Sequence, residues 1–174
     1  SSEKRRALLR ELTEHFFGAS ARTATEDTLY GAVLASLATE METAVRAELS
    51  ARFADAPDAP HALIRRLAND EAAVAGAVLA ASPVLTDEDL LGVVRKHGQD
   101  HLRAISTRSS VSEAVTDIIV ERGDDETLGT LLRNDGARLS RKSSEAAVER
   151  ARINPALHEA TVSRASLPAD LLNE

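Results

Sequence analysis

The stretch SVSEAVTDIIVERGDDETLGTLLRN, residues 110–134, contains two short apolar runs separated by a glycine and three acids. Apolar residues recur in both runs at the three- and four-residue spacing of a helix. The acids after Gly123 stand where the second helix would begin, and negative side chains are stabilised at the positive end of a helix dipole. The stretch therefore predicts short helices that follow one another with tight turns between them.

The same pattern recurs on both sides of this stretch. VAGAVLAASPVLTDEDLLGVVRKHG occupies residues 74–98, LRAISTRSSVSEAVTDIIVERG occupies residues 102–123, and the pattern begins again at Leu128 and Leu157. A spacing of roughly 25–30 residues is typical of stacked helix pairs, each of which is too small to bury its own apolar face. The expected helix starts are Thr86 with Asp89, Ser110 with Glu113, and Asn154 with Pro155.

The N-terminal part has longer helical stripes. Residues 8–17 form one stripe, and we expect Gly18 to end it in a left-handed conformation. Thr23 and Glu26 then predict a helix start. The apolar stripe of residues 29–53 fits either one long helix or two helices that break near Thr39.

The segment ADAPDAP, residues 54–60, has two prolines in four positions and cannot lie inside a helix. We therefore expect an N-terminal helical cap over residues 1–54 and helical repeats over residues 55–174, in one continuous domain. Alternating strand patterns are absent, so the predicted fold class is all-α, as a short right-handed α-solenoid.

Composition limits the functional classes. The 174 residues include no cysteine and no tryptophan, which excludes disulfides and thiolate metal sites and fits a cytoplasmic protein. No apolar stretch is long enough to cross a membrane, and no signal peptide precedes the helices. The chain begins at Ser1 without a methionine, so we expect native terminal residues to lie outside it. Residues 31–132 hold 9 basic against 17 acidic residues, which disfavours nucleic acid as a partner.

Particular segments resemble a known class of repeats. DDETLGTLLRND at residues 124–135 and QDHLRAISTRS at residues 99–109 resemble HEAT-like helical repeats, especially the bacterial leucine-rich variant. Over residues 4 to about 152 the chain resembles a bacterial HEAT-like family of unknown function. The segments that carry this resemblance are RRALLRELTEHFF, LIRRLANDEAAVAGAVLAASPVLTDEDLL and SVSEAVTDIIVERGD. The resemblance implies a helical-repeat fold and no catalytic residue. Leucine-rich variants often carry an iron–sulfur cluster on cysteines, which this chain lacks.

Motifs for catalysis or metal binding are weak. No phosphate-binding glycine loop or nucleophile elbow is present. His97 and His101 have a spacing that can hold a metal, but Gly98 lies between them and we expect no metal site. The acids of residues 86–89 and 124–126 are explained by helix starts, so we expect neither a calcium loop nor paired catalytic carboxylates. We predict that the protein is not an enzyme and has no cofactor.

Basic residues near the ends of the second helices are the candidate binding site. In VVRKHG, IIVERG and AAVERARI they fall at equivalent positions in successive repeats, and equivalent positions of a solenoid form a row along one face. Such a row could hold an acidic segment of another protein. The alternative is that basic side chains stabilise the negative end of a helix dipole. The candidates are Arg95, Lys96, Arg122, Arg150 and Arg152.

The pattern as a whole predicts a non-catalytic protein–protein interaction module or scaffold. The alternative is a nucleic-acid-binding HEAT-like protein of the DNA glycosylase type, which would need a basic face and aromatic residues to hold an extruded base. We also expect that the N-terminal helices either cap the stack or self-associate through an uncovered part of the stripe of residues 29–53.

Overall fold

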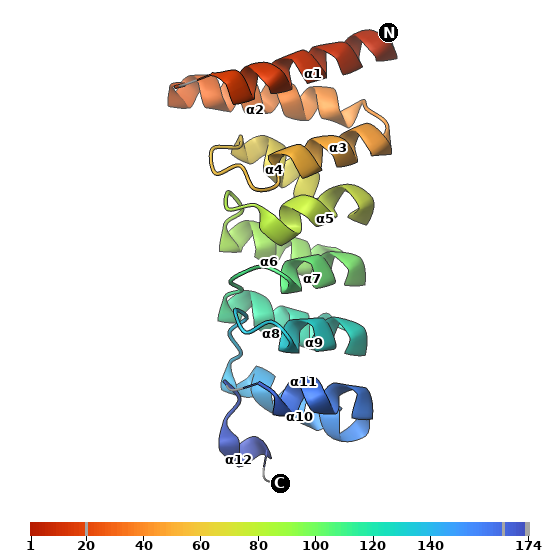
Figure 1. Cartoon of the computed structure of the whole chain (residues 1–174), viewed down its shortest axis with the longest axis vertical. Coiled ribbons are helices and arrows are strands. Elements are labelled where there is room, and N and C mark those ends of the chain that lie inside the picture. The colour runs from red at the N-terminus through yellow and green to blue at the C-terminus, as the bar shows by residue number, and fades with distance from the viewer. Residues whose placement is uncertain (20, 165, 173–174) are drawn as a thin grey trace. The chain divides into compact units, whose positions relative to one another are not determined.

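The computed structural model describes residues 1–19, 21–164 and 166–172. Within these ranges the chain is helical and has no strand, which confirms the all-α prediction. The helices, shown in Figure 1, are α1 (Ser2–Gly18), α2 (Ala24–Thr39), α3 (Thr43–Phe53), α4 (His61–Ala68), α5 (Ala72–Ala81), α6 (Asp87–Lys96), α7 (Gln99–Ser106), α8 (Glu113–Arg122), α9 (Asp125–Leu132), α10 (Arg141–Ile153), the 3₁₀ turn η1 (Pro155–Leu157), α11 (His158–Val162) and α12 (Ala169–Leu172).

The chain divides into two compact units. We call residues 1–78 and 82–85 the N-terminal unit, and residues 79–81 and 86–174 the C-terminal unit. The boundary expected after Ala54 lies inside the N-terminal unit, between α3 and α4. The assignment of a cap to residues 1–54 and of one repeat domain to residues 55–174 stays a prediction.

In the N-terminal unit, α1 packs beside α2, and α2 packs on α4, which also contacts α3. The apolar stripe of residues 29–53 forms two helices, since α2 ends at Thr39 and α3 begins at Thr43. Gly31 marks the face of α2 that meets α4, because a Cβ atom there would lie 2.8 Å from Cβ of Pro60. Phe16 and Phe53 are fully buried, with ring centroids 5.1 Å apart. This aromatic contact joins α1 to α3.

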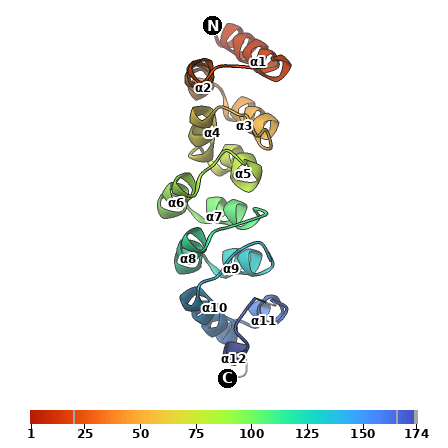
Figure 2. The ribbon, with the colours of Figure 1, turned by 90° about the vertical axis from the view of Figure 1, so that its left-hand side faces the viewer.

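The C-terminal unit consists of two rows of helices. In Figure 2, α6, α8 and α10 form one row and α7, α9 and α11 form the other. Each helix packs against its neighbours in the same row, so α8 contacts both α6 and α10, and α9 contacts both α7 and α11. The core between the rows is aliphatic because the chain has few aromatic residues. Its fully buried side chains include Val93, Leu102, Ile105, Ile119, Leu128 and Leu131.

Neighbouring pairs are also joined by polar caps. In the row of α7, α9 and α11, the turn after each helix carries a side chain that donates hydrogen bonds to the preceding pair. The acceptors are carbonyls at or just after the ends of α5, α7 and α9, respectively. The last carbonyls of a helix have no partner within that helix, so a donor from the next pair can satisfy them. The donors and their acceptors are Arg108 to Leu79 O at 2.9 Å, Asn134 to Ser106 O at 2.8 Å and Arg108 O at 2.6 Å, and Arg164 to Leu132 O at 3.1 Å and Asn134 O at 2.7 Å.

Several predicted helix starts are confirmed. Thr86 accepts from the backbone N–H of Asp89 at 3.2 Å, and the Asp89 carboxylate accepts from the N–H of Thr86 at 3.0 Å, which completes a capping box. Thr23 accepts from the N–H of Glu26 in the same way. Asn154 caps η1 with Pro155 at its first position, so this start is confirmed, although the first turn is 3₁₀.

Two local predictions are wrong. Ser110 does not cap a helix. Ser112 caps α8 instead, because the backbone of Val111 is held by Gly136 and Arg138 in an isolated parallel bridge. Gly18 is the last residue of α1 and not a left-handed stop. No glycine among the described residues has a positive φ, so none of them ends a helix in the left-handed conformation.

Candidate interaction surfaces

The packing of the C-terminal unit decides which basic residues occupy equivalent positions. Val93 and Val94 of α6 are buried as Ile119 and Val120 of α8 are, and as Ala147 and Val148 of α10 are. These buried residues align Val94 with Val120 and Val148. The residues two positions after each of them, Lys96, Arg122 and Arg150, are therefore equivalent and form one row. By the same count, Arg95 corresponds to Glu121 and Glu149. The predicted row therefore includes Lys96, and Arg95 lies outside it.

Arg122 and Arg150 contact the end of the preceding second helix. The Arg122 guanidinium donates to the carbonyls of Val94 and His97, the latter at 2.8 Å. Arg150 donates to the carbonyl of Gly123 at 3.0 Å and forms an ion pair with Asp125 at 2.5 Å. These arginines therefore act on a helix dipole, as the alternative interpretation expected, but on that of the neighbouring helix and not of their own.

The other predicted binding residues lie on the surface. Arg95 and Lys96 are exposed and form no hydrogen bond or ion pair with the residues that the structure describes. Arg152 is exposed and pairs with Glu149 at 3.2 Å. The structure thus leaves Arg95 and Lys96 available to a partner, whereas Arg122 and Arg150 are engaged within the fold. The binding role of all five residues stays a prediction.

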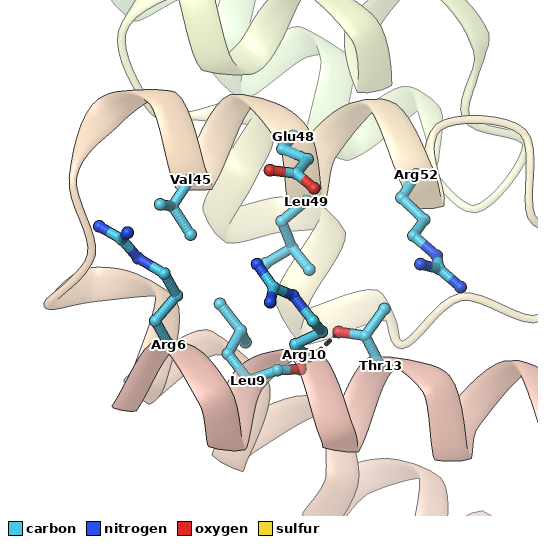
Figure 3. Close-up of a pocket in the computed structure, with 8 residues that line it drawn as sticks. All are labelled: Arg6, Leu9, Arg10, Thr13, Val45, Glu48, Leu49 and Arg52. Carbon is cyan, nitrogen blue, oxygen red and sulfur yellow. Dashed lines mark hydrogen bonds between the residues drawn. The ribbon is translucent and has the colours of Figure 1, made fainter. Parts of the chain in front are cut away.

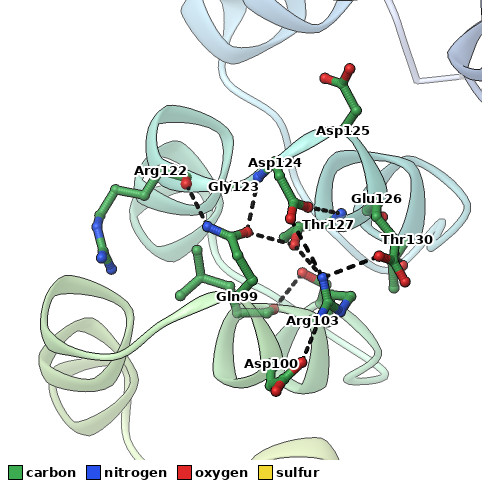
Figure 4. A network of polar contacts seen from close by, with 12 residues as sticks. Gln99, Asp100, Arg103, Arg122, Gly123, Asp124, Asp125, Glu126, Thr127 and Thr130 are labelled. Carbon is green, nitrogen blue, oxygen red and sulfur yellow. Dashed lines mark hydrogen bonds and ion pairs between the residues drawn. The ribbon is translucent and has the colours of Figure 1, made fainter.

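The acids after Gly123 belong to a network of polar contacts between α7 and α9, shown in Figure 4. Asp124 caps α9 by accepting from the N–H of Thr127 at 2.8 Å, and this hydrogen bond is the main cause of a lowered pKa of Asp124. Gln99 accepts from the N–H of Asp124 at 2.9 Å, and Arg103 pairs with Glu126 at 3.5 Å. Each acid has a structural partner, so the helix start and the neighbouring arginines account for all three acids.

His97 and His101 lie closer together than expected. Their rings stack with centroids 4.3 Å apart, although His97 follows α6 and His101 lies within α7. Burial lowers the pKa of His97, with smaller contributions from His101 and Lys96. The described residues contain no group of three His, Asp or Glu side chains that could hold a metal ion. The stacked rings form a packing contact between the end of α6 and α7.

A groove between α1 and α2 has a mainly apolar lining. Its volume is about 360 Å³, and Leu12, Tyr30, Leu29 and Val33 line it. Leu29 is 61% exposed and Val33 is 48% exposed, whereas Leu34 on the opposite side of α2 is fully buried. Part of the stripe that begins at Leu29 is thus uncovered by the described residues. A contiguous exposed apolar surface of this kind commonly marks an interface.

A smaller groove of about 60 Å³ lies between α1 and α3 (Figure 3). Leu9, Val45 and Leu49 form its apolar floor, and Arg6 and Arg10 lie at its edge. These two arginines were not among the binding residues predicted from the sequence. Their four-residue spacing within RRALLR placed them on one helix face, but only the fold brings α3 opposite that face. Arg6 pairs with Glu42 at 3.0 Å, which links the two helices.

No helix among the described residues is long and apolar enough to cross a membrane. A search of curated proteins and a search of solved structures found no match. A family model described as "Uncharacterised protein conserved in bacteria (DUF2336)" matches residues 74–174, from α5 to the end of the chain. This match covers more than half of the sequence, and it agrees with the expected bacterial family of unknown function. The chain therefore belongs to the bacterial family DUF2336.

Proposed function

We propose that the chain is a non-catalytic protein–protein interaction module, built from HEAT-like helix pairs that stack as a short right-handed α-solenoid. The two rows of helices in the C-terminal unit and the caps repeated between successive pairs support the repeat architecture. Stacked helix pairs offer extended surfaces for other proteins.

The uncovered groove between α1 and α2 carries the proposal. Arg6, Arg122, Arg150 and the acids after Gly123 have partners within the fold. The exposed charges of Arg10, Arg95 and Lys96 can be solvated by water. At the groove, the large apolar side chains of Leu29 and Val33 remain exposed without a structural reason inside the described chain. Covering them with another protein surface would remove apolar area from water, which is the main favourable term in association.

The test is site-specific photocrosslinking in cells of a bacterium that carries the protein. A photoreactive amino acid replaces Leu29 in one variant and Glu113, an exposed residue of α8, in a matched control. We expect light-dependent protein adducts at position 29, whether with another protein or with a second copy, and none above background at position 113. The absence of any protein adduct at position 29 would refute the proposed function.

A further inference from the structure

We propose that the groove between α1 and α2 is covered by the same groove of a second copy, in an antiparallel twofold dimer. This inference rests on the proposed function and names the partner of that site. It depends on two features of the N-terminal unit, namely the absence of charge along the outer face of α2 and the distribution of charge at the two ends of the helix pair.

The outer face of α2 is apolar and narrow. Gly31 and Leu34 face inwards, so the side opposite α4 carries Leu29, Ala32 and Val33. The sequence TLYGAVLASLAT, residues 28–39, contains no charged residue, although much of this side is exposed. Small side chains such as Ala32 let two helices approach closely and leave space for a leucine from the facing helix. This surface is therefore suited to another helix of the same kind.

The two ends of the surface carry opposite free charges. α1 and α2 run antiparallel, since Tyr30 donates to the carbonyl of Leu12 and Arg5 pairs with Glu40 at 2.7 Å. Lys4 therefore lies at the end of the pair where α2 finishes, and Glu26 lies where α2 begins. Both are exposed, and neither side chain forms a hydrogen bond or ion pair with a residue that the structure describes. The two charges stand about 20 Å apart, given 1.5 Å per helical residue.

A twofold axis through the middle of α2 brings these ends together. In a twofold interface the same patch faces itself, and residue i meets residue j while j meets i. With the two copies of α2 antiparallel near Ala32, Glu26 of one copy approaches Lys4 of the other, and this occurs twice. A parallel arrangement would instead place Glu26 against Glu26. Charge complementarity therefore selects a second copy in the antiparallel orientation.

The size of the surface indicates a weak dimer. α2 has 16 residues, and a helix of this length spans about 24 Å. Two adjacent helices of roughly 10 Å diameter then offer about 500 Å² per copy. This area is near the lower limit for a specific interface, so we expect dissociation in the micromolar range and not an obligate dimer.

Sedimentation velocity of the full chain between about 2 and 200 µM tests the inference. We expect concentration-dependent dimers for the parent and monomers for Leu29→Glu, while Glu113→Lys on α8 serves as the control and dimerises like the parent. Lys4→Glu and Glu26→Lys should each weaken the dimer by roughly tenfold, since each change turns two attractive pairs into repulsive ones. The double variant Lys4→Glu/Glu26→Lys should return to within about threefold of the parent. Circular dichroism checks that each variant is folded.

Two results would overturn the dimer. A parent that remains monomeric at 200 µM rules out the second copy as occupant. A double variant that dimerises no better than either single variant rules out the antiparallel orientation. If position 29 crosslinks to a different protein while the purified chain stays monomeric, the dimer fails and the proposed function stands. If neither experiment detects a partner, both fail.

Discussion

Replacing Arg164 with methionine should destabilise the C-terminal unit strongly. Arg164 follows α11 and is 2% exposed, and its guanidinium donates to the carbonyls of Leu132, Asn134 and Ala137. Burial lowers the pKa of Arg164, but an arginine pKa starts so high that the side chain stays charged at neutral pH. The three carbonyls lie at the end of α9 and in the turn after it, so the side chain fastens two successive pairs together.

The expected loss follows from the three acceptors. A buried carbonyl without its donor costs about 1–3 kcal/mol, and the lower value applies because a carbonyl keeps a second lone pair. The Asn134 carbonyl also accepts from the backbone N–H of Ala137 at 3.1 Å, so only the carbonyls of Leu132 and Ala137 lose their donor, and the sum is about 2 kcal/mol. Methionine avoids the desolvation of a charge and retains much of the apolar stem, which offsets about 1 kcal/mol. The free energy of unfolding of Arg164→Met should therefore fall by about 1–2 kcal/mol, and that of Arg164→Lys by less, since an ammonium can reach only some of the carbonyls.

Urea unfolding followed by circular dichroism measures this change. Arg138→Met is the matched control, because the Arg138 side chain is exposed and forms no hydrogen bond or ion pair with the described residues. Hydrogen exchange should quicken in α9 and α11 of Arg164→Met and remain unchanged in α6. A stability of Arg164→Met within about 0.5 kcal/mol of the parent would show that the three carbonyls do not depend on this donor.

Three further predictions concern single residues. Burial lowers the pKa of His97, so below about pH 6.5 the unfolded chain binds more protons than the folded one. The free energy of unfolding, measured by urea titration, should therefore fall between pH 7 and pH 5. The fall should be less steep in His97→Gln. Gly136→Ala should destabilise the fold by roughly 2–4 kcal/mol, since the new Cβ atom would lie 2.0 Å from the backbone carbonyl oxygen of Ser109. Gly92→Ala is the control, because a Cβ atom there meets open space and should not destabilise the fold. Equal urea midpoints for the two variants would contradict this prediction. In thermal unfolding, Arg122→Gln should lower the free energy of unfolding by about 1 kcal/mol and Arg95→Gln should leave it almost unchanged, because only Arg122 binds helix-end carbonyls. A larger loss of stability in Arg95→Gln than in Arg122→Gln would contradict this prediction.

Features encoded within a few neighbouring residues could be predicted from the sequence. The Thr86–Asp89 capping box, the Asp124 cap and the all-α class follow from local spacing, and the structure has them. Ser110 failed as a cap because a backbone contact with residues more than twenty positions away overrides the local signal. The sequence also did not show which of Arg95 and Lys96 is equivalent to Arg122 and Arg150. The spacing between equivalent positions changes from 26 residues between Lys96 and Arg122 to 28 between Arg122 and Arg150, and a count along the chain cannot detect this change.

The candidate surfaces also depend partly on local sequence and partly on contacts between distant residues. The length of the stripe of residues 29–53 left two alternatives open, namely that the N-terminal helices cap the stack or that part of the stripe is uncovered. It did not show that Leu29 and Val33 are the uncovered members and Leu34 the buried one, since this depends on which side of α2 meets α4. The partners of Arg122 could not be predicted either, because its acceptor carbonyls lie 25 and 28 residues earlier in the chain.

Each polar cap between neighbouring helix pairs joins a carbonyl to a donor that is synthesised later in the chain. The carbonyls at the end of α7 receive their donor from Asn134, 28 residues after Ser106, and those at the end of α9 wait for Arg164. A ribosome adds about 5–20 residues per second, so a newly emerged pair spends roughly 1.5–6 s with these carbonyls exposed to water. Completion of each pair therefore lags behind translation by one pair, and a nascent chain that pauses after α9 presents an unfinished helix end to the surrounding water.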